Sequence, residues 1–129
     1  MNAHAPLPAE VVRLPWRLRV VPASPTLDRL VENGTIDIRQ HAAALAYAAL
    51  RRRYERSGGP FRSWRDRSGM SDERWQATKR DHARLIRAAG AERFVLDRLC
   101  LDDDAPLPFE VERVRTALGR VVKMMESDG

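Results

Sequence analysis

The side chains that most often do chemistry in proteins are few in this sequence and widely spaced. The three histidines show no metal-ligand spacing, and His82 is expected to pack on the core side of a helix; they are His4, His41 and His82. A single cysteine, Cys100, lies in an apolar run, so neither an internal disulfide nor a cysteine metal cluster can form. A glycine-rich phosphate loop and a serine nucleophile elbow are both missing. We therefore predict a protein that is not an enzyme and that binds no metal or cofactor.

The strongest binding signal is a run of arginines between residues 51 and 67. Seven arginines stand against two carboxylates there, a surplus of +5 that equals the net charge of the whole 129-residue chain. Arginine neutralises phosphates and an exposed aromatic ring can stack on a base, so this composition favours nucleic-acid binding. The predicted phosphate contacts are Arg51, Arg52, Arg53, Arg56, Arg62, Arg65 and Arg67, with Trp64 as a source of sequence preference. The alternative is a solvated helix end, with Trp64 pinning a loop to the core.

A second candidate surface lies near the C-terminus. A short helix over about 91–101, a turn and an amphipathic helix over about 109–125 could form a helix-turn-helix whose last helix faces the major groove. The turn contains Asp102, Asp103 and Asp104, which lack the pattern of a calcium loop and are expected to be solvated. Plain packing within a helical bundle is the alternative, because Glu110 lies where base contacts usually fall. The exposed reading face would comprise Arg113, Thr116, Arg120 and Lys123.

The first 25 residues differ in composition from the rest of the chain. They hold five of the eight prolines, which rules out a continuous helix and predicts an extended arm. Within the arm, apolar residues alternate with arginine and proline, which gives one apolar edge that could pack on its own domain, bind a protein partner or mediate a homodimer. The residues of this predicted partner-binding edge are Leu14, Trp16, Leu18 and Val20.

The remaining sequence predicts helices throughout. Thr26 is a plausible N-cap for a helix that ends at Asn33-Gly34, and Asp37 with Gln40 forms a capping box for a longer helix to about residue 56. Ser71 caps a third helix, which Gly90 closes. We predict an all-α fold: an extended arm over 1–25 and one compact domain of about five helices over 26–126.

One further pattern begins with Ser24-Pro25-Thr26-Leu27-Asp28-Arg29-Leu30 and continues at Gly34, Ile36, Gln40, Ala43 and Tyr47. In these residues the chain resembles a family of small helical proteins of unknown function from alphaproteobacteria and their phages. A related C-terminal domain occurs in activators of gene transfer agent production and resembles a sigma-factor-like DNA-binding unit. The resemblance implies a role in transcription regulation or in phage biology.

These observations predict a basic protein that binds nucleic acid, most plausibly double-stranded DNA, in a regulatory setting. The alternative is a non-enzymatic adaptor or phage accessory protein that binds another protein through the N-terminal arm. No apolar run approaches the ~20 residues of a membrane span, and the N-terminus lacks the pattern of a signal peptide, so we expect a cytoplasmic location.

Overall fold

The computed structural model describes residues 24–57 and 71–128, and this part of the chain is all-helical, as predicted. The helices are α1 (Pro25–Glu32), α2 (Ile38–Arg56), α3 (Asp72–Ala89), α4 (Arg93–Cys100) and α5 (Val111–Asp128). Two short 3₁₀ helices, η3 (Gly90–Glu92) and η4 (Pro108–Glu110), lead into α4 and α5. The predicted N-terminal arm, with Leu14, Trp16, Leu18 and Val20, lies outside the described residues except for its end.

The helix boundaries follow from local hydrogen bonds that the sequence encodes. The capping box of α2 is confirmed, because the Asp37 carboxylate accepts from the Gln40 backbone N–H at 2.7 Å. Ser71 caps α3 as predicted. The predicted N-cap of α1 is wrong: Ser24 occupies that position, because Pro25 takes the first helical position that suits proline.

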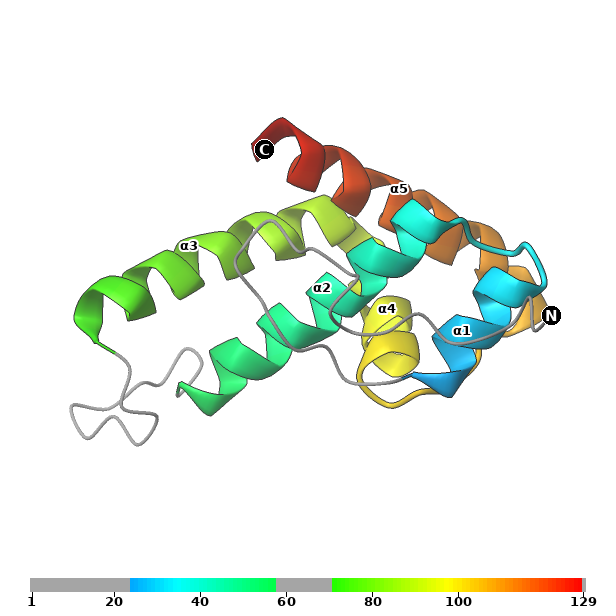
Figure 1. The fold of residues 1–129 in the computed structure, drawn as a ribbon, viewed down its shortest axis with the longest axis horizontal. Coiled ribbons are helices and arrows are strands. Elements are labelled where there is room, and N and C mark those ends of the chain that lie inside the picture. Colours follow the sequence, from blue (N-terminus) through cyan, green and yellow to red (C-terminus); the bar gives the residue numbers. More distant parts are fainter. Residues whose placement is uncertain (1–23, 58–70, 129) are drawn as a thin grey trace, which may run out of the picture.

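Helix α2 is the centre of the molecule and packs against every other α-helix (Figure 1). All residues from Ala43 to Leu50 are buried, so the helix is enclosed around its whole circumference rather than along one stripe. Five of these eight residues are alanines, whose small side chains let the neighbouring helices approach closely.

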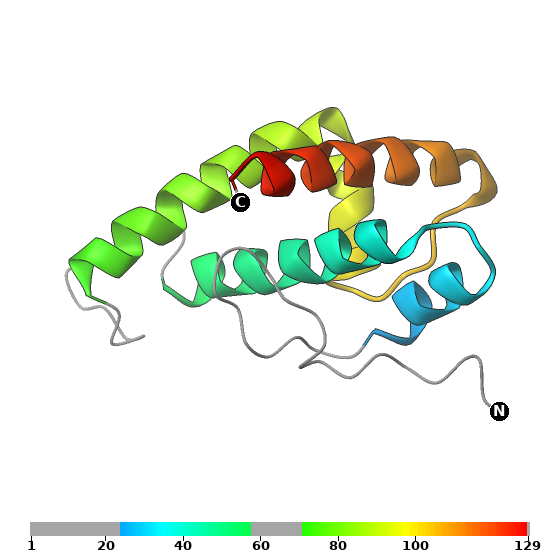
Figure 2. The same ribbon diagram turned by 45° about the horizontal axis from the view of Figure 1, so that its top comes forward.

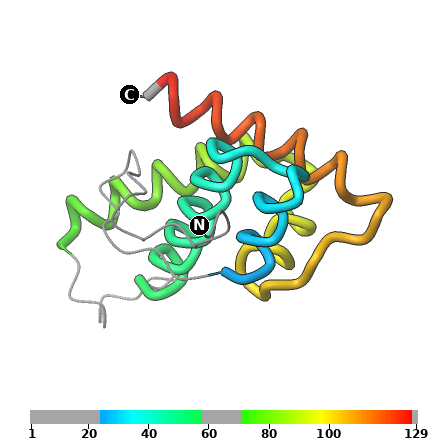
Figure 3. Tube along the Cα trace, turned by 45° about the vertical axis from the view of Figure 1, so that its right-hand side comes forward, coloured from blue at the N-terminus to red at the C-terminus, as the bar shows by residue number. Residues whose placement is uncertain are grey.

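The other helices surround α2 on different sides. Figure 2 shows α3 and α5 next to each other above α2, and α4 crossing between this pair and α2. Helix α1 lies beside α2 and α4 (Figure 3). The buried His41 on α2 faces α1, with its Nε2 atom 3.0 Å from the Asp28 carboxylate.

The turn between α4 and η4 holds α1 in place. Its three aspartates are exposed, as expected, but Asp103 also binds α1. Its carboxylate accepts hydrogen bonds from the Ser24 hydroxyl at 2.8 Å and from the Thr26 backbone N–H at 3.2 Å. The Thr26 hydroxyl in turn donates to the Asp103 carbonyl at 2.8 Å. Asp103 thus supplies a negative charge at the N-terminus of α1, where the helix dipole favours one.

Candidate nucleic-acid interface

Arg51, the first residue of the predicted arginine cluster, forms hydrogen bonds to side chains of two other helices. Its Nε and Nη2 atoms donate to the two oxygens of Asp97 on α4, both at 3.3 Å, and its Nη1 atom donates to His82 Nε2 on α3 at 3.1 Å. Only 17% of the Arg51 side chain is exposed. Burial opposes the charged form, but the hydrogen bonds and charge of Asp97 more than offset it and raise the pKa of Arg51. Arg51 therefore fastens α2 to α3 and α4, and we leave it out of the candidate interface.

Asp97 also binds the most buried polar side chain of α2. The Tyr47 hydroxyl donates to Asp97 Oδ1 at 2.6 Å, and the tyrosine side chain is fully buried. Burial, together with the adjacent carboxylate, raises the pKa of Tyr47 well above its ordinary value. Tyr47 therefore keeps its proton and acts as a hydrogen-bond donor.

His82 is part of a column of three aromatic rings between α2 and α3. Tyr54 stacks on His82 with ring centroids 3.7 Å apart and on Trp75 with centroids 5.7 Å apart. Trp75 and His82 lie seven residues apart on one side of α3, about 10.5 Å along its axis, so the Tyr54 ring fits between them. Burial and the nearby charge of Arg51 lower the pKa of His82 to about 4. This packed, neutral imidazole agrees with the prediction for His82.

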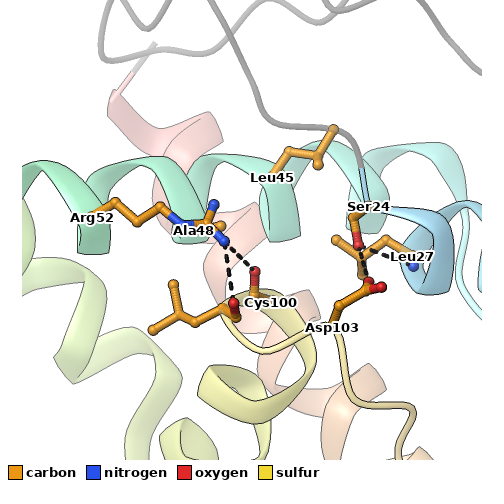
Figure 4. Close-up of a pocket in the computed structure, with 8 residues that line it drawn as sticks. Ser24, Leu27, Leu45, Ala48, Arg52, Cys100 and Asp103 are labelled. Carbon is orange, nitrogen blue, oxygen red and sulfur yellow. Dashed lines mark hydrogen bonds between the residues drawn. The ribbon is translucent and has the colours of Figure 1, made fainter.

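Arg52 points toward the C-terminal end of α4. Its Nη2 atom donates to the carbonyl oxygens of Cys100 and Leu101 at 3.4 and 3.3 Å, which suits a helix end that carries unpaired carbonyls and partial negative charge (Figure 4). Arg52, Cys100 and Leu101 line a hollow with an empty volume of about 270 Å³, part of it open solvent, together with Ser24, Leu27, Leu45, Ala48 and Asp103. Arg52 therefore stabilises the fold too, and we leave it out of the interface.

Arg120, predicted to read bases from the last helix, has a different role in the structure. Its Nε and Nη2 atoms donate to the carbonyls of Ala88 and Ala89, both at 2.8 Å, and so satisfy the C-terminal end of α3. The chain then turns at Gly90, which has a φ of 67°. A Cβ atom there would lie 3.3 Å from Arg120 Nη2. The backbone conformation thus favours glycine, and any larger residue would also crowd the Arg120 guanidinium.

The N-terminal end of α5 is tied to α4 by an ion pair. The two Glu110 oxygens accept from Arg98 Nη1 and Nη2, both at 2.8 Å, and one of them also accepts from the Leu107 backbone N–H at 2.9 Å. These hydrogen bonds lower the pKa of Glu110. On the exposed side of α5, Arg115 pairs with Glu112 at 2.9 Å. Of the predicted reading face, Arg113, Thr116 and Lys123 are exposed and take part in no ion pair with a described residue.

Three arginines that make none of these internal contacts lie where α2 ends and α3 begins, at the same end of the molecule (Figure 1). They are Arg53, Arg56 and Arg74. Partial burial and the positive charges of Arg74 and Arg56 lower the pKa of Arg53, whereas Asp81 raises it. Within the described residues no ion pair joins any of these three arginines to a carboxylate. We call Arg53, Arg56 and Arg74 the basic cluster.

Arg74 was not among the predicted contacts, although a signal for it exists in the sequence. The capping serine at position 71 places Arg74 in the first turn of α3. Tyr54 near the end of α2 stacks on Trp75 near the start of α3, so the two helix ends lie close together. The other predicted contacts, Arg62, Trp64, Arg65 and Arg67, lie in segment 58–70 and thus outside the described residues.

The positive charge of the chain is unevenly distributed. The described residues contain seventeen Lys and Arg against sixteen Asp and Glu, so they contribute only +1 of the chain's +5. The remaining +4 belongs to residues 1–23 and 58–70. Segment 58–70 carries +2 of this charge and is joined to the ends of α2 and α3 that hold the basic cluster.

Neither a metal centre nor a membrane span is found in residues 24–57 and 71–128. These residues hold no group of three or more histidine, cysteine, aspartate or glutamate side chains able to bind a metal ion. None of their helices is long and apolar enough to cross a membrane. The Cys100 thiol is buried, and burial raises its pKa to about 12, which keeps it protonated and unreactive at neutral pH.

No protein family, curated protein or solved structure matches this chain. The resemblance to small alphaproteobacterial and phage proteins stays a prediction.

Proposed function

We propose that this protein binds nucleic acid, specifically double-stranded DNA, through phosphate contacts made by the basic cluster, in a cytoplasmic regulatory role related to transcription or phage biology. The observation that carries the proposal is the gathering of Arg53, Arg56 and Arg74 at the junction of α2 and α3, where Tyr54 stacks on Trp75 and no described carboxylate forms an ion pair with these arginines. Like charges that repel one another in the free protein gain the most from an added anion. A row of phosphates supplies several such anions at once.

The rigidity of the surrounding structure supports this assignment. Arg53 follows Arg51 and Arg52, both of which are tied to α4, and precedes Tyr54, which is stacked between two rings of α3. The backbone that carries Arg53 is therefore held by contacts on several sides. Such support reduces the entropy that would otherwise be lost when the guanidinium groups bind.

A salt titration tests the proposal directly. Binding of the protein to a random-sequence duplex is followed by fluorescence anisotropy between about 50 and 200 mM salt. We expect micromolar or tighter binding whose logarithm falls linearly with the logarithm of the salt concentration. The double variant Arg53→Glu/Arg56→Glu should weaken binding to all duplexes alike and reduce the slope by about 2, one unit for each lost phosphate contact.

A matched control separates this local effect from a change in overall charge. Arg113→Glu/Lys123→Glu alters the net charge by the same amount on α5, at two exposed positions without an ion pair to a described residue. We expect this variant to retain most of the affinity. Equal losses in both variants would contradict a localised site, and no binding of the natural chain at low salt would contradict nucleic-acid binding altogether.

A protein-binding adaptor is the second candidate, and one observation favours it. The side chains of Phe94 on α4 and Phe109 on η4 are 66% and 68% exposed, although large aromatic side chains are usually buried. The predicted arm would offer a further apolar edge for a protein partner or a second copy of the chain. Deleting residues 1–21 should abolish a partner complex or a dimer, measured by light scattering, but should leave most of the DNA affinity intact if the basic cluster is the site.

A further inference from the structure

Helix α3 presents a long exposed face on the side opposite its core contacts. At about 100° per residue, Gln76, Arg80, Ala83 and Arg87 fall within an arc of about 60°. Each of these residues is exposed. The buried Thr78, Leu85 and Ala89 lie on the other side of the helix. The outer face of α3, defined by Gln76, Arg80, Ala83 and Arg87, therefore points into solvent along more than three turns.

This face carries positive charge only. Lys79 flanks it and is also exposed. The acidic Asp72 and Glu73 lie on the same side of the helix, but one turn before Gln76. The exposed side of α5 is mixed: Arg113 and Lys123 have no ion pair to a described residue, but Arg115 pairs with Glu112 and Arg120 is bonded to the end of α3. Of these two helices of 18 residues, α3 thus has the surface that better complements a polyanion.

The width of an α-helix, about 10–12 Å with its side chains, suits the DNA major groove. Gln76 and Arg87 are eleven residues apart, or about 16 Å along the helix. The major groove is about 12 Å wide and accepts an α-helix. Ala83, in the middle of the face, has a side chain small enough for the helix to approach the base edges, and Gln76 is of a type that can bind adenine with two hydrogen bonds.

We infer that α3 is the helix that enters the major groove, with Arg80 and Arg87 directed to the DNA and Gln76 available for base contacts. This inference rests on the proposed DNA binding and adds the groove, the helix and the residues that would set sequence preference. It replaces α5 as the reading helix. Arg74 of the basic cluster begins the same helix but lies about 150° round it from this face, so the basic cluster would contact phosphates at the end of α3 and not along the groove.

Cysteine labelling can decide between the two helices, because the natural thiol of Cys100 is buried and protonated. Ala83→Cys places a reactive thiol on the outer face of α3, and Thr116→Cys places a matched one on the exposed side of α5. Each variant is treated with a maleimide dye, with and without saturating duplex, after anisotropy has shown that the unlabelled variant still binds.

We expect the duplex to slow labelling at position 83 by more than tenfold and to leave the rate at position 116 within about twofold. Protection of position 116 alone would overturn the inference in favour of α5. Binding with both thiols accessible would also overturn it, yet leave the proposed phosphate contacts of the basic cluster standing. Failure of the natural chain to bind any duplex would instead refute the proposed function.

Discussion

Replacing Asp97 with alanine should destabilise the protein by about 3 kcal/mol. The change would leave the fully buried Tyr47 hydroxyl without its 2.6 Å acceptor, and a stranded buried hydroxyl costs about 1–3 kcal/mol. It would also leave the charge of Arg51 unpaired by Asp97, and breaking a buried ion pair costs about 3–5 kcal/mol. The second cost is reduced here, because 25% of the Asp97 side chain is exposed and Glu55 lies 3.4 Å from Arg51.

Urea denaturation followed by circular dichroism measures this effect. With a slope of about 2 kcal/mol/M, the midpoint should fall by about 1.5 M. Asp97→Asn keeps an oxygen for Tyr47 but loses the charge, so its midpoint should lie between those of the alanine variant and the natural chain. Asp102→Ala, at an exposed position of the neighbouring turn, should change stability by less than about 0.5 kcal/mol. A loss below about 1 kcal/mol for Asp97→Ala would refute the view that this network joins α2, α3 and α4.

Three further predictions concern Arg120, His82 and Asp103. Arg120→Ala should lower the free energy of unfolding by about 1–2 kcal/mol, because two carbonyls at the end of α3 lose their donors, and binding-site selection should show unchanged base preference. The lowered pKa of His82 means that its contribution to stability is complete above about pH 6.5 and is lost as the pH falls toward about 4. Because the ring keeps some contact with water, we expect a loss of about 1–2 kcal/mol over that range in urea titrations, and a flatter profile for His82→Phe. Asp103→Ala should cost about 1–2 kcal/mol and speed amide hydrogen exchange in α1 more than in α3; uniform exchange in both helices would contradict its role as an anchor for α1.

The helices and their ends could largely be predicted from the sequence. The bonds that start α2 and α3 join residues only three positions apart, Asp37 to Gln40 and Ser71 to Arg74, so short sequence patterns contain the whole interaction. The same holds for the glycine after α3, whose φ of 67° few other residues adopt. The error at the start of α1 arose because Thr26 and Ser24 are both good caps, and Pro25 decides between them.

The use of each arginine could not be predicted in this way. Arg51, Arg52 and Arg53 are neighbours of identical chemistry, yet the first pairs with Asp97, the second binds the end of α4, and the third joins the basic cluster. Successive helical positions point about 100° apart, so each side chain meets a different part of the fold. A count of arginines therefore predicted a cluster of phosphate contacts, but not which members remain available for them.

The sequence by itself determined the all-helical class and the caps that begin α2 and α3. These depend on composition, periodicity and hydrogen bonds between near neighbours. Only the tertiary structure decided that Arg51 and Arg120 hold the helices together and that α3 has the exposed basic face. The physical reason is distance along the chain. Arg51 finds Asp97 46 residues away and Arg120 finds Ala88 32 residues away, and such partners are fixed by how the helices pack.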